Sequence, residues 1–234
     1  MTAIYKREMK AYFTSPNGYV YICAFLFLSA LFFKMYMLDN GISNVGYFFG
    51  GSLIMYMFLV PILTMRLFSE EKKSKTDQIL LTSPVSVSGI VLGKFFAAFS
   101  VFVIALVPTL VSMMFVGMYG NLSVGLMIGN YIGIILLGAA FIAIGCFLSA
   151  ITESQVVAAV LSFAILMSLY FLDTLSSSIN STVVSAVVSF ISVYDRYSDF
   201  TSGLFPLSSV VYYISVGVIF LFLTVRVIEK RRWS

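Results

Sequence analysis

The sequence predicts an all-α polytopic membrane protein with six transmembrane helices, an N-terminal interfacial helix and a short helix on a cytoplasmic connector. Of its 234 residues, 60% are hydrophobic and only 10% are charged, and the mean hydropathy is +1.03. A soluble domain carries about 25% charged residues. The apolar runs are near the roughly 20 residues that a spanning helix needs, and they lack the alternation of a membrane β-barrel.

Six apolar segments are candidate transmembrane helices, because a helix satisfies its own backbone hydrogen bonds in lipid. Three of the five connectors are short, and they contain Asp39-Asn40-Gly41, Gly120-Asn121 and Thr152-Glu153-Ser154. Two connectors are long, spanning 66–94 and 173–207. The six predicted spans are Tyr19–Leu38, Tyr47–Met65, Phe95–Met118, Gly125–Ile151, Val156–Leu172 and Ser208–Val227.

Basic residues predict the orientation, since Lys and Arg accumulate on the cytoplasmic side of membrane proteins. The N-terminal tail, the 66–94 connector and the C-terminal tail hold most of the 14 basic residues. Six spans place these three segments on one side. We therefore expect a multi-pass protein of the cell membrane with both termini in the cytoplasm.

The N-terminal segment, residues 1–16, predicts an amphipathic helix that lies in the membrane interface. Apolar and basic residues alternate there at near-helical spacing until Pro16-Asn17-Gly18 breaks the chain. An ordinary positively charged tail is the alternative interpretation. The residues assigned to the interfacial helix are Lys6, Arg7, Lys10, Tyr12 and Phe13.

The 66–94 connector holds the densest charge cluster of the chain, followed by Ile79-Leu80-Leu81. Ser74-Lys-Thr-Asp77 fits a capping box and Pro84 disfavours helix at Ser83, so we expect a helix over 75–82. Its apolar side chains need a partner. The adjacent charges sum to zero, which suits a protein surface better than anionic lipid.

Two other features leave alternatives open. Segment 173–207 is extracytoplasmic in this topology. Part of it, Thr182–Val193, is apolar but too short to span the membrane, so we expect a helix in or near the outer leaflet. A re-entrant segment is the alternative. Gly125, Gly129 and Gly133 form a GxxxGxxxG ridge that favours close helix packing, either within the chain or between two chains.

Composition excludes several chemistries. The chain has no histidine, which removes imidazole metal ligands and Ser-His pairs, and we expect no metal site. No GxxxxGK[ST] phosphate loop is present. No acidic residue falls in the middle of a predicted span, as an ion-driven carrier would normally need. We expect the energy source to lie on another protein.

At this point the whole chain resembles the permease subunits of type-2 ABC exporters, and most closely the gliding-motility and nitrous-oxide-reductase-maturation branch. The most specific stretch is Phe68-Ser-Glu70-Glu71-Lys72-x3-Thr76-Asp77-x2-Leu80-Leu81-Thr82-Ser83-Pro84, followed by Ile90-Val-Leu-Gly93-Lys94. The N-terminal Lys-Arg-Glu-x-Lys-x-Tyr-Phe-x-Ser-Pro and Tyr194–Gly203 support it. Many members have glycine where this chain has Lys75.

The resemblance implies a single type-2 ABC transmembrane domain over 1–234, without an ATPase site of its own. A second permease chain, identical or not, would complete the translocation pathway. A separate ABC ATPase would hold ATP and Mg²⁺ and dock on the 69–84 helix, the coupling helix. The resemblance places the contact at Glu70, Glu71, Lys72, Thr76, Asp77, Leu80, Leu81 and Pro84.

Rival functions remain at this stage. An ATP-independent secondary carrier would work without any nucleotide, and an intramembrane enzyme would need a positioned nucleophile and base. A membrane assembly or sensor protein would show the same apolar helices. The sequence does not specify the transported substrate, although the serine-rich spans favour lipid-like or amphipathic cargo over ions.

Overall fold

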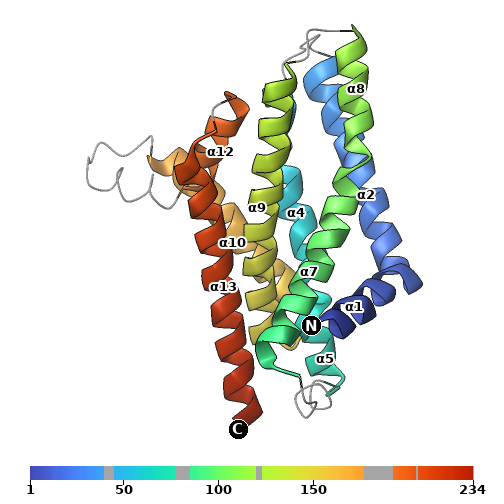
Figure 1. Ribbon diagram of the computed structural model, residues 1–234, viewed down its shortest axis with the longest axis vertical. Coiled ribbons are helices and arrows are strands. Elements are labelled where there is room, and N and C mark those ends of the chain that lie inside the picture. The colour runs from blue at the N-terminus through green and yellow to red at the C-terminus, as the bar shows by residue number, and fades with distance from the viewer. Residues whose placement is uncertain (40–44, 77–84, 120–122, 177–191, 204, 234) are drawn as a thin grey trace.

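The computed structural model (Figure 1) describes residues 1–39, 45–76, 85–119, 123–176, 192–203 and 205–233. In these ranges every regular element is a helix, which confirms the all-α prediction. Both termini lie at the same end of an elongated bundle, together with the ends of α5 (Arg66–Lys73) and α7 (Val87–Leu106) that flank the 74–86 connector.

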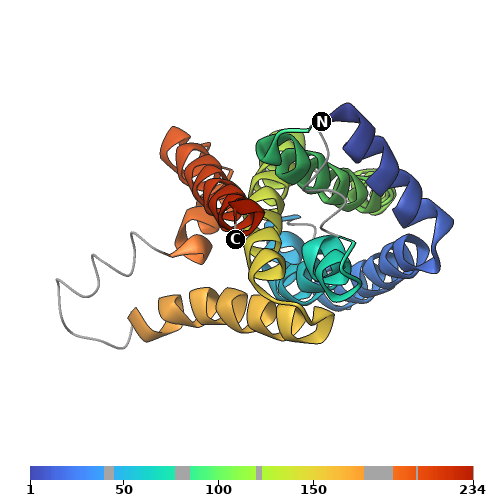
Figure 2. The same cartoon turned by 90° about the horizontal axis from the view of Figure 1, so that it is seen from below.

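The N-terminal helix α1 (Thr2–Thr14) crosses the end of the bundle against α7, as the view from below shows (Figure 2). Ile4 and Tyr12 are buried, whereas Lys6, Arg7 and Lys10 are exposed. The structure thus has a helix at this position with exposed basic side chains, and its placement in the membrane interface stays a prediction. Ser15 is extended and Pro16 begins α2 (Pro16–Phe33), where the missing N–H of proline costs nothing.

A π-helical turn, η1 (Lys34–Leu38), ends the first pass. The second pass is built from three successive helices, α3 (Val45–Gly51), α4 (Leu53–Thr64) and α5, and not from one. Ser52, between α3 and α4, donates its hydroxyl to the Phe48 carbonyl at 2.6 Å. The chain continues beyond the predicted span as α5, whose Leu67, Phe68 and Ser69 are buried.

The third pass begins at Val87, well before the predicted Phe95, because Ser86 caps it by accepting a hydrogen bond from the Gly89 N–H at 3.2 Å. It is interrupted at Val107-Pro108 and resumes as α8 (Thr109–Tyr119). The break falls at Pro108, whose ring removes a backbone N–H donor and disfavours a continuous helix. The 66–94 connector is therefore much shorter than predicted, since helices occupy both of its ends.

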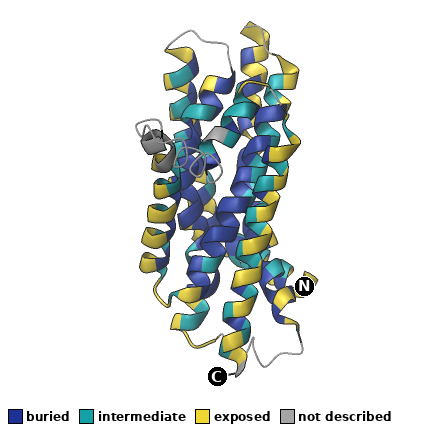
Figure 3. Ribbon diagram, turned by 90° about the vertical axis from the view of Figure 1, so that its left-hand side faces the viewer, coloured by how far each residue is buried: buried dark blue, intermediate teal, exposed yellow. Residues whose placement is uncertain are grey.

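The fourth pass, α9 (Val124–Ile151), is the centre of the bundle and contacts α3, α4, α5, α7, α10, α12 and α13. Glycines permit this close packing: a methyl group at Gly138 would overlap the Phe102 ring, and one at Gly145 would overlap Thr64. The most deeply buried residues line the inner faces of the helices around it, while the outward faces are exposed (Figure 3).

Two passes and a short outer helix complete the bundle. They are α10 (Gln155–Ser176), α12 (Val193–Thr201) and α13 (Leu207–Trp233). Five helical stretches in the described residues are long and apolar enough to cross a membrane. The predicted fifth span falls on α10, whose apolar part over Gln155–Phe171 is shorter. Most of the predicted Thr182–Val193 helix lies outside the described residues.

The glycine ridge packs within the chain at Gly133, where a methyl group would lie 2.9 Å from Phe200 Cγ of α12. Asn130 reinforces this contact by donating to the Phe200 carbonyl at 3.2 Å and accepting from Tyr197 Oη at 3.4 Å. Among the described residues, no atom lies within 4 Å of a methyl group placed at Gly125. The ridge therefore serves an intrachain contact at one end and is open at the other.

The two ends of the ridge should respond differently to the same substitution. Gly133→Ala is expected to lower the unfolding free energy by about 1–3 kcal/mol, because the new methyl group crowds the root of the Phe200 side chain. Gly125→Ala is expected to be neutral or slightly stabilising, since alanine favours the helix. Unfolding by SDS in mixed micelles, followed by circular dichroism, compares them; equal effects would contradict the intrachain assignment.

Candidate functional site

Four charged side chains from three helices meet where the chain enters and leaves the 74–86 connector. They are Arg7 and Glu8 of α1, Glu71 of α5 and Lys94 of α7, here called the ionic cluster. α5 leads into the connector and α7 leads out of it. The cluster therefore joins both flanks of the connector to the N-terminal helix.

Lys94 is the centre of the ionic cluster and its side chain is only 1% exposed. Its ammonium group lies 2.9 Å from Glu71 Oε2 and 3.3 Å from Glu8 Oε1, and donates to the Leu67 carbonyl at 2.5 Å. It also lies 5.2 Å from the centre of the Phe68 ring. Three donors with three acceptors satisfy a charge that burial would otherwise make very costly.

Arg7 closes the ionic cluster at the surface. Its guanidinium donates to Glu71 Oε1 at 2.5 Å and to Glu8 Oε1 at 2.6 Å. Burial by itself raises the pKa of Glu8, but the charges and hydrogen bonds of Lys94 and Arg7 outweigh it and hold that pKa below its ordinary value. The cluster contains two acids and two bases, so its net charge is zero.

The lowered pKa of Glu8 predicts acid sensitivity. Its stabilising contribution is present above the ordinary carboxyl value of 4.5 and is lost as pH falls through the lower folded-state pKa. Glu8→Gln should therefore show a shallower loss of unfolding free energy between neutral pH and about pH 3 than the parent chain. Measuring SDS unfolding across that range tests it; parallel curves would contradict a role for the Glu8 charge.

A second polar contact supports the joint between α4 and α5. The buried Ser149 hydroxyl of α9 accepts from the Phe68 N–H at 3.0 Å and the Ser69 N–H at 3.2 Å, and donates to the Met65 carbonyl at 3.0 Å. These backbone groups flank the point where α4 ends and α5 begins. A side chain of the central helix thus replaces hydrogen bonds that a continuous helix would make itself.

Tyr12 and Arg66 connect α1 to the same joint. Tyr12 Oη donates to the Leu63 carbonyl at 3.0 Å, and the Arg66 guanidinium lies 5.4 Å from the centre of the Tyr12 ring. Arg66 also pairs with Glu70 at 3.3 Å, one helical turn later. The N-terminal helix is consequently fixed to the second pass by aromatic and polar contacts as well as by the ionic cluster.

Ser74 ends α5. Asp77, the other end of the predicted capping box, lies outside the described residues, so the helix start at Ser74 stays a prediction. The Ser74 backbone is α-helical and its hydroxyl donates to the Glu70 carbonyl at 2.9 Å. The Thr76 N–H bonds to the Glu71 carbonyl and the Lys75 N–H to the Lys72 carbonyl. This is a Schellman motif, which places Lys75 in the left-handed region at φ 56°.

The Schellman motif explains why glycine suits position 75, and it predicts opposite effects for the same change two residues apart. Lys75→Gly is expected to stabilise the chain by about 0.5–1 kcal/mol, because relief of left-handed strain exceeds the entropic cost of glycine. Lys73→Gly, at the last residue of α5, is expected to destabilise the chain by about 0.5 kcal/mol, less than glycine costs in a helix interior. SDS unfolding measures both; a loss in both variants would contradict the motif.

The structure places the residues predicted to contact the ATPase in different environments. Glu71 is turned into the ionic cluster, with its side chain 19% exposed, while Glu70 is 50% exposed and paired with Arg66. Lys72 lies near the end of α5 and Thr76 is exposed in the turn that follows it. Asp77, Leu80, Leu81 and Pro84, with most of the predicted 75–82 helix, lie outside the described residues.

Sequence reasoning missed the roles of Lys94, Glu8 and Ser149. Lys94 was assigned only to the connector and to a motif. A signal was present, since a lysine placed within a long apolar run needs a buried partner unless it reaches water. Ser149 gave no comparable signal, because serine is a common small residue in membrane helices.

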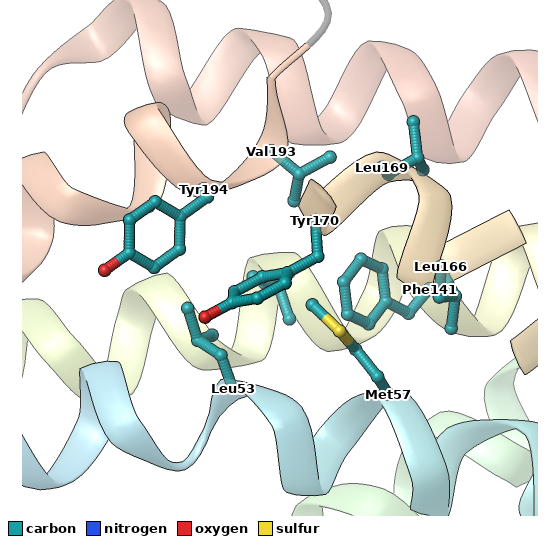
Figure 4. Close-up of a pocket in the computed structure, with 9 residues that line it drawn as sticks. Leu53, Met57, Phe141, Leu166, Leu169, Tyr170, Val193 and Tyr194 are labelled. Carbon is teal, nitrogen blue, oxygen red and sulfur yellow. The ribbon is translucent and has the colours of Figure 1, made fainter. Parts of the chain in front are cut away.

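A small apolar pocket lies at the junction of α4, α9, α10 and α12 (Figure 4), with a volume of about 10 Å³. Leu53, Met57 and Phe141 form its floor, and the Tyr170 and Tyr194 rings meet edge to face across it at 5.5 Å. It holds no more than one water-sized probe. In this conformation it is a packing defect and too small for a substrate.

Long apolar helices around a packed centre, with an ion-paired polar layer at the end where both termini lie, define an integral membrane protein. The chain belongs to the ABC-2 family of transporters: the family model described as "ABC-2 family transporter protein" matches residues 3–225. Proteins of this family are membrane components of ABC transporters, not ATPases themselves, and work with an ABC ATPase. A search of the curated proteins finds no match.

Proposed function

We propose that this chain is the permease subunit of an ATP-driven exporter, and that the 74–86 connector couples it to the ATPase. The observation that carries the proposal is the Lys94–Glu71 ion pair at 2.9 Å, which ties the helix entering the connector to the helix leaving it. A push on the connector would then move α5 and α7 together.

The contacts around the ionic cluster support a route for that movement into the membrane. Glu8 and Arg7 would carry it into α1, and Ser149 would carry it from α5 to the central helix α9. A loosely attached loop would absorb the same push, since a two-state element must be rigid to transmit force. The proposed ATPase contacts are Glu70, Lys72, Thr76 and the segment 77–84.

We further propose that both termini are cytoplasmic, that a second permease chain completes the pathway, and that ATP and Mg²⁺ bind on the partner. The first is supported by the position of both termini at the same end of the bundle as the ends of α5 and α7 that flank the connector (Figure 1). Apolar side chains exposed along α2 and α13, including Phe27, Val218 and Phe222, support lipid or a second chain as their neighbour.

Site-specific photocrosslinking tests the coupling proposal. A photoreactive residue at Thr76 is expected to capture the ATPase in native membranes, identified by mass spectrometry through its nucleotide-binding sequence, whereas one at Phe222 is expected not to. Adding Leu80→Asp and Leu81→Asp should abolish capture at position 76. An ATPase that co-purifies but is not captured at 76 would contradict the coupling site.

The same experiment separates the alternatives. If no ATPase accompanies the chain from membranes that keep other ABC complexes intact, an ATP-independent carrier or a membrane assembly or sensor protein becomes the better proposal. Transport into vesicles without nucleotide would then identify the carrier. If transport is lost when ATP is depleted, the ATP-independent carrier is excluded.

A further inference from the structure

An open groove of about 670 Å³ lies between α12 and α13 at the end of the bundle opposite the termini. Its volume falls in the range of small-molecule sites. From α13 it is lined by Leu207, Ser208, Val211, Ser215 and Ile219, and from α12 by Arg196. Neither the ionic cluster nor the connector contributes to it.

Arg196 gives the groove a charged end. Its guanidinium lies 4.6 Å from the centre of the Tyr212 ring, so that the ring supports one face of the guanidinium plane. Stacking of this kind orients the N–H donors, which lie at the edge of the plane and match phosphate geometry. Ser208, in the first turn of α13, adds a hydroxyl to the groove, while the neighbouring Ser209 hydroxyl donates to Asp199 Oδ2 at 3.3 Å.

The rest of the groove is suited to a hydrocarbon chain. Leu207, Val211 and Ile219 are exposed aliphatic side chains on a helix that is apolar enough to span a membrane. From Leu207 to Ile219 an α-helix rises about 18 Å. One leaflet of the hydrocarbon core is about 15 Å thick, half of the 30 Å of the bilayer. An acyl chain would therefore run the length of the groove.

We propose that this groove binds one anionic phospholipid of the surrounding membrane, with its phosphate on Arg196 and an acyl chain along α13. Charge complementarity decides between occupants. A free phosphate would leave the aliphatic wall unused, and a neutral lipid would gain little from Arg196. A second copy of the chain would need an acidic residue placed opposite it. This site does not depend on the proposed transport function.

Lipid binding to the purified full-length protein tests the proposal. Native mass spectrometry would titrate phosphatidylglycerol and phosphatidylcholine against the parent chain, which is expected to prefer phosphatidylglycerol by about tenfold. Arg196→Gln is expected to remove that preference, because the charge-assisted hydrogen bonds are lost. Ser215→Phe, which keeps Arg196 but fills the groove, is expected to weaken phosphatidylglycerol binding several-fold.

The control is Arg226→Gln, an exposed arginine on the same helix near its other end, which should keep the preference. Because the result is a ratio of two lipids on one protein, partial destabilisation of a variant does not mimic it. A parent chain without preference, an Arg196→Gln variant that retains it, or equal loss in Arg226→Gln would each overturn the proposal. So would displacement of the lipid by equimolar inorganic phosphate.

Discussion

Replacing Lys94 with methionine is expected to lower the unfolding free energy by about 3 kcal/mol, because two largely buried acids would keep only the half-exposed Arg7 as a counter-charge. Methionine preserves the length and most of the volume of the side chain, so the loss comes from charge. Glu71 and Glu8 would lose the ammonium group that lies 2.9 and 3.3 Å away. SDS unfolding in mixed micelles, followed by circular dichroism, measures the effect.

Lys6→Met is the matched control, since Lys6 is an exposed lysine on α1, and its effect should stay within about 0.5 kcal/mol. Adding Glu71→Gln and Glu8→Gln to Lys94→Met should recover part of the loss, because the uncompensated charges disappear with it. Equal effects of Lys94→Met and Lys6→Met would contradict the ionic cluster. If the loss in the triple variant equals the sum of the losses in the three single variants, the side chains of the ionic cluster act independently of one another.

Replacing Ser149 with alanine is expected to cost about 2 kcal/mol, because the Phe68 and Ser69 N–H groups lose their acceptor in a buried place. Alanine is smaller by one oxygen and a better helix former, so neither crowding nor helix propensity explains a loss. The same unfolding measurement gives the magnitude. Hydrogen exchange at 68 and 69 should accelerate before the global transition.

Ser168→Ala provides the control for Ser149→Ala. Ser168 is exposed on α10 and its hydroxyl donates to the Ala164 carbonyl of its own helix at 2.7 Å. Removing it leaves no buried donor without an acceptor, so the effect should be within about 0.5 kcal/mol. If both variants behave alike, the α4–α5 joint does not depend on Ser149.

Both predictions concern residues whose importance depends on distant parts of the chain. Glu8 and Lys94 are 86 positions apart, and Ser149 is 81 positions from Phe68. Local patterns predicted that 6–10 is helical and basic and that 90–94 lies near a membrane boundary. They carry no information about which acid meets which base, because pairing depends on how the helices cross.

The end of α5, where the connector begins, also shows what the local sequence predicts and what tertiary contacts add. The Ser74-to-Asp77 spacing predicts a helix start, and the structure shows that the same serine ends α5, whose Leu67 and Phe68 are buried. Once α5 is held against α9, its carbonyls at 71 and 72 need donors, which Lys75 and Thr76 supply. The end of α5 thus combines a local hydrogen-bonding motif with the burial of α5 against the bundle.

The sequence by itself determined the membrane class, the helical fold, the approximate spans and the helix at the N-terminus. These follow from hydrophobicity and its period, which act over one helix at a time. Only the tertiary structure decided the Lys94 pairs, the use of Ser149, the contact of Gly133 with Phe200 and the groove beside Arg196. Each of these depends on which faces of separate helices meet, and no local pattern encodes that geometry.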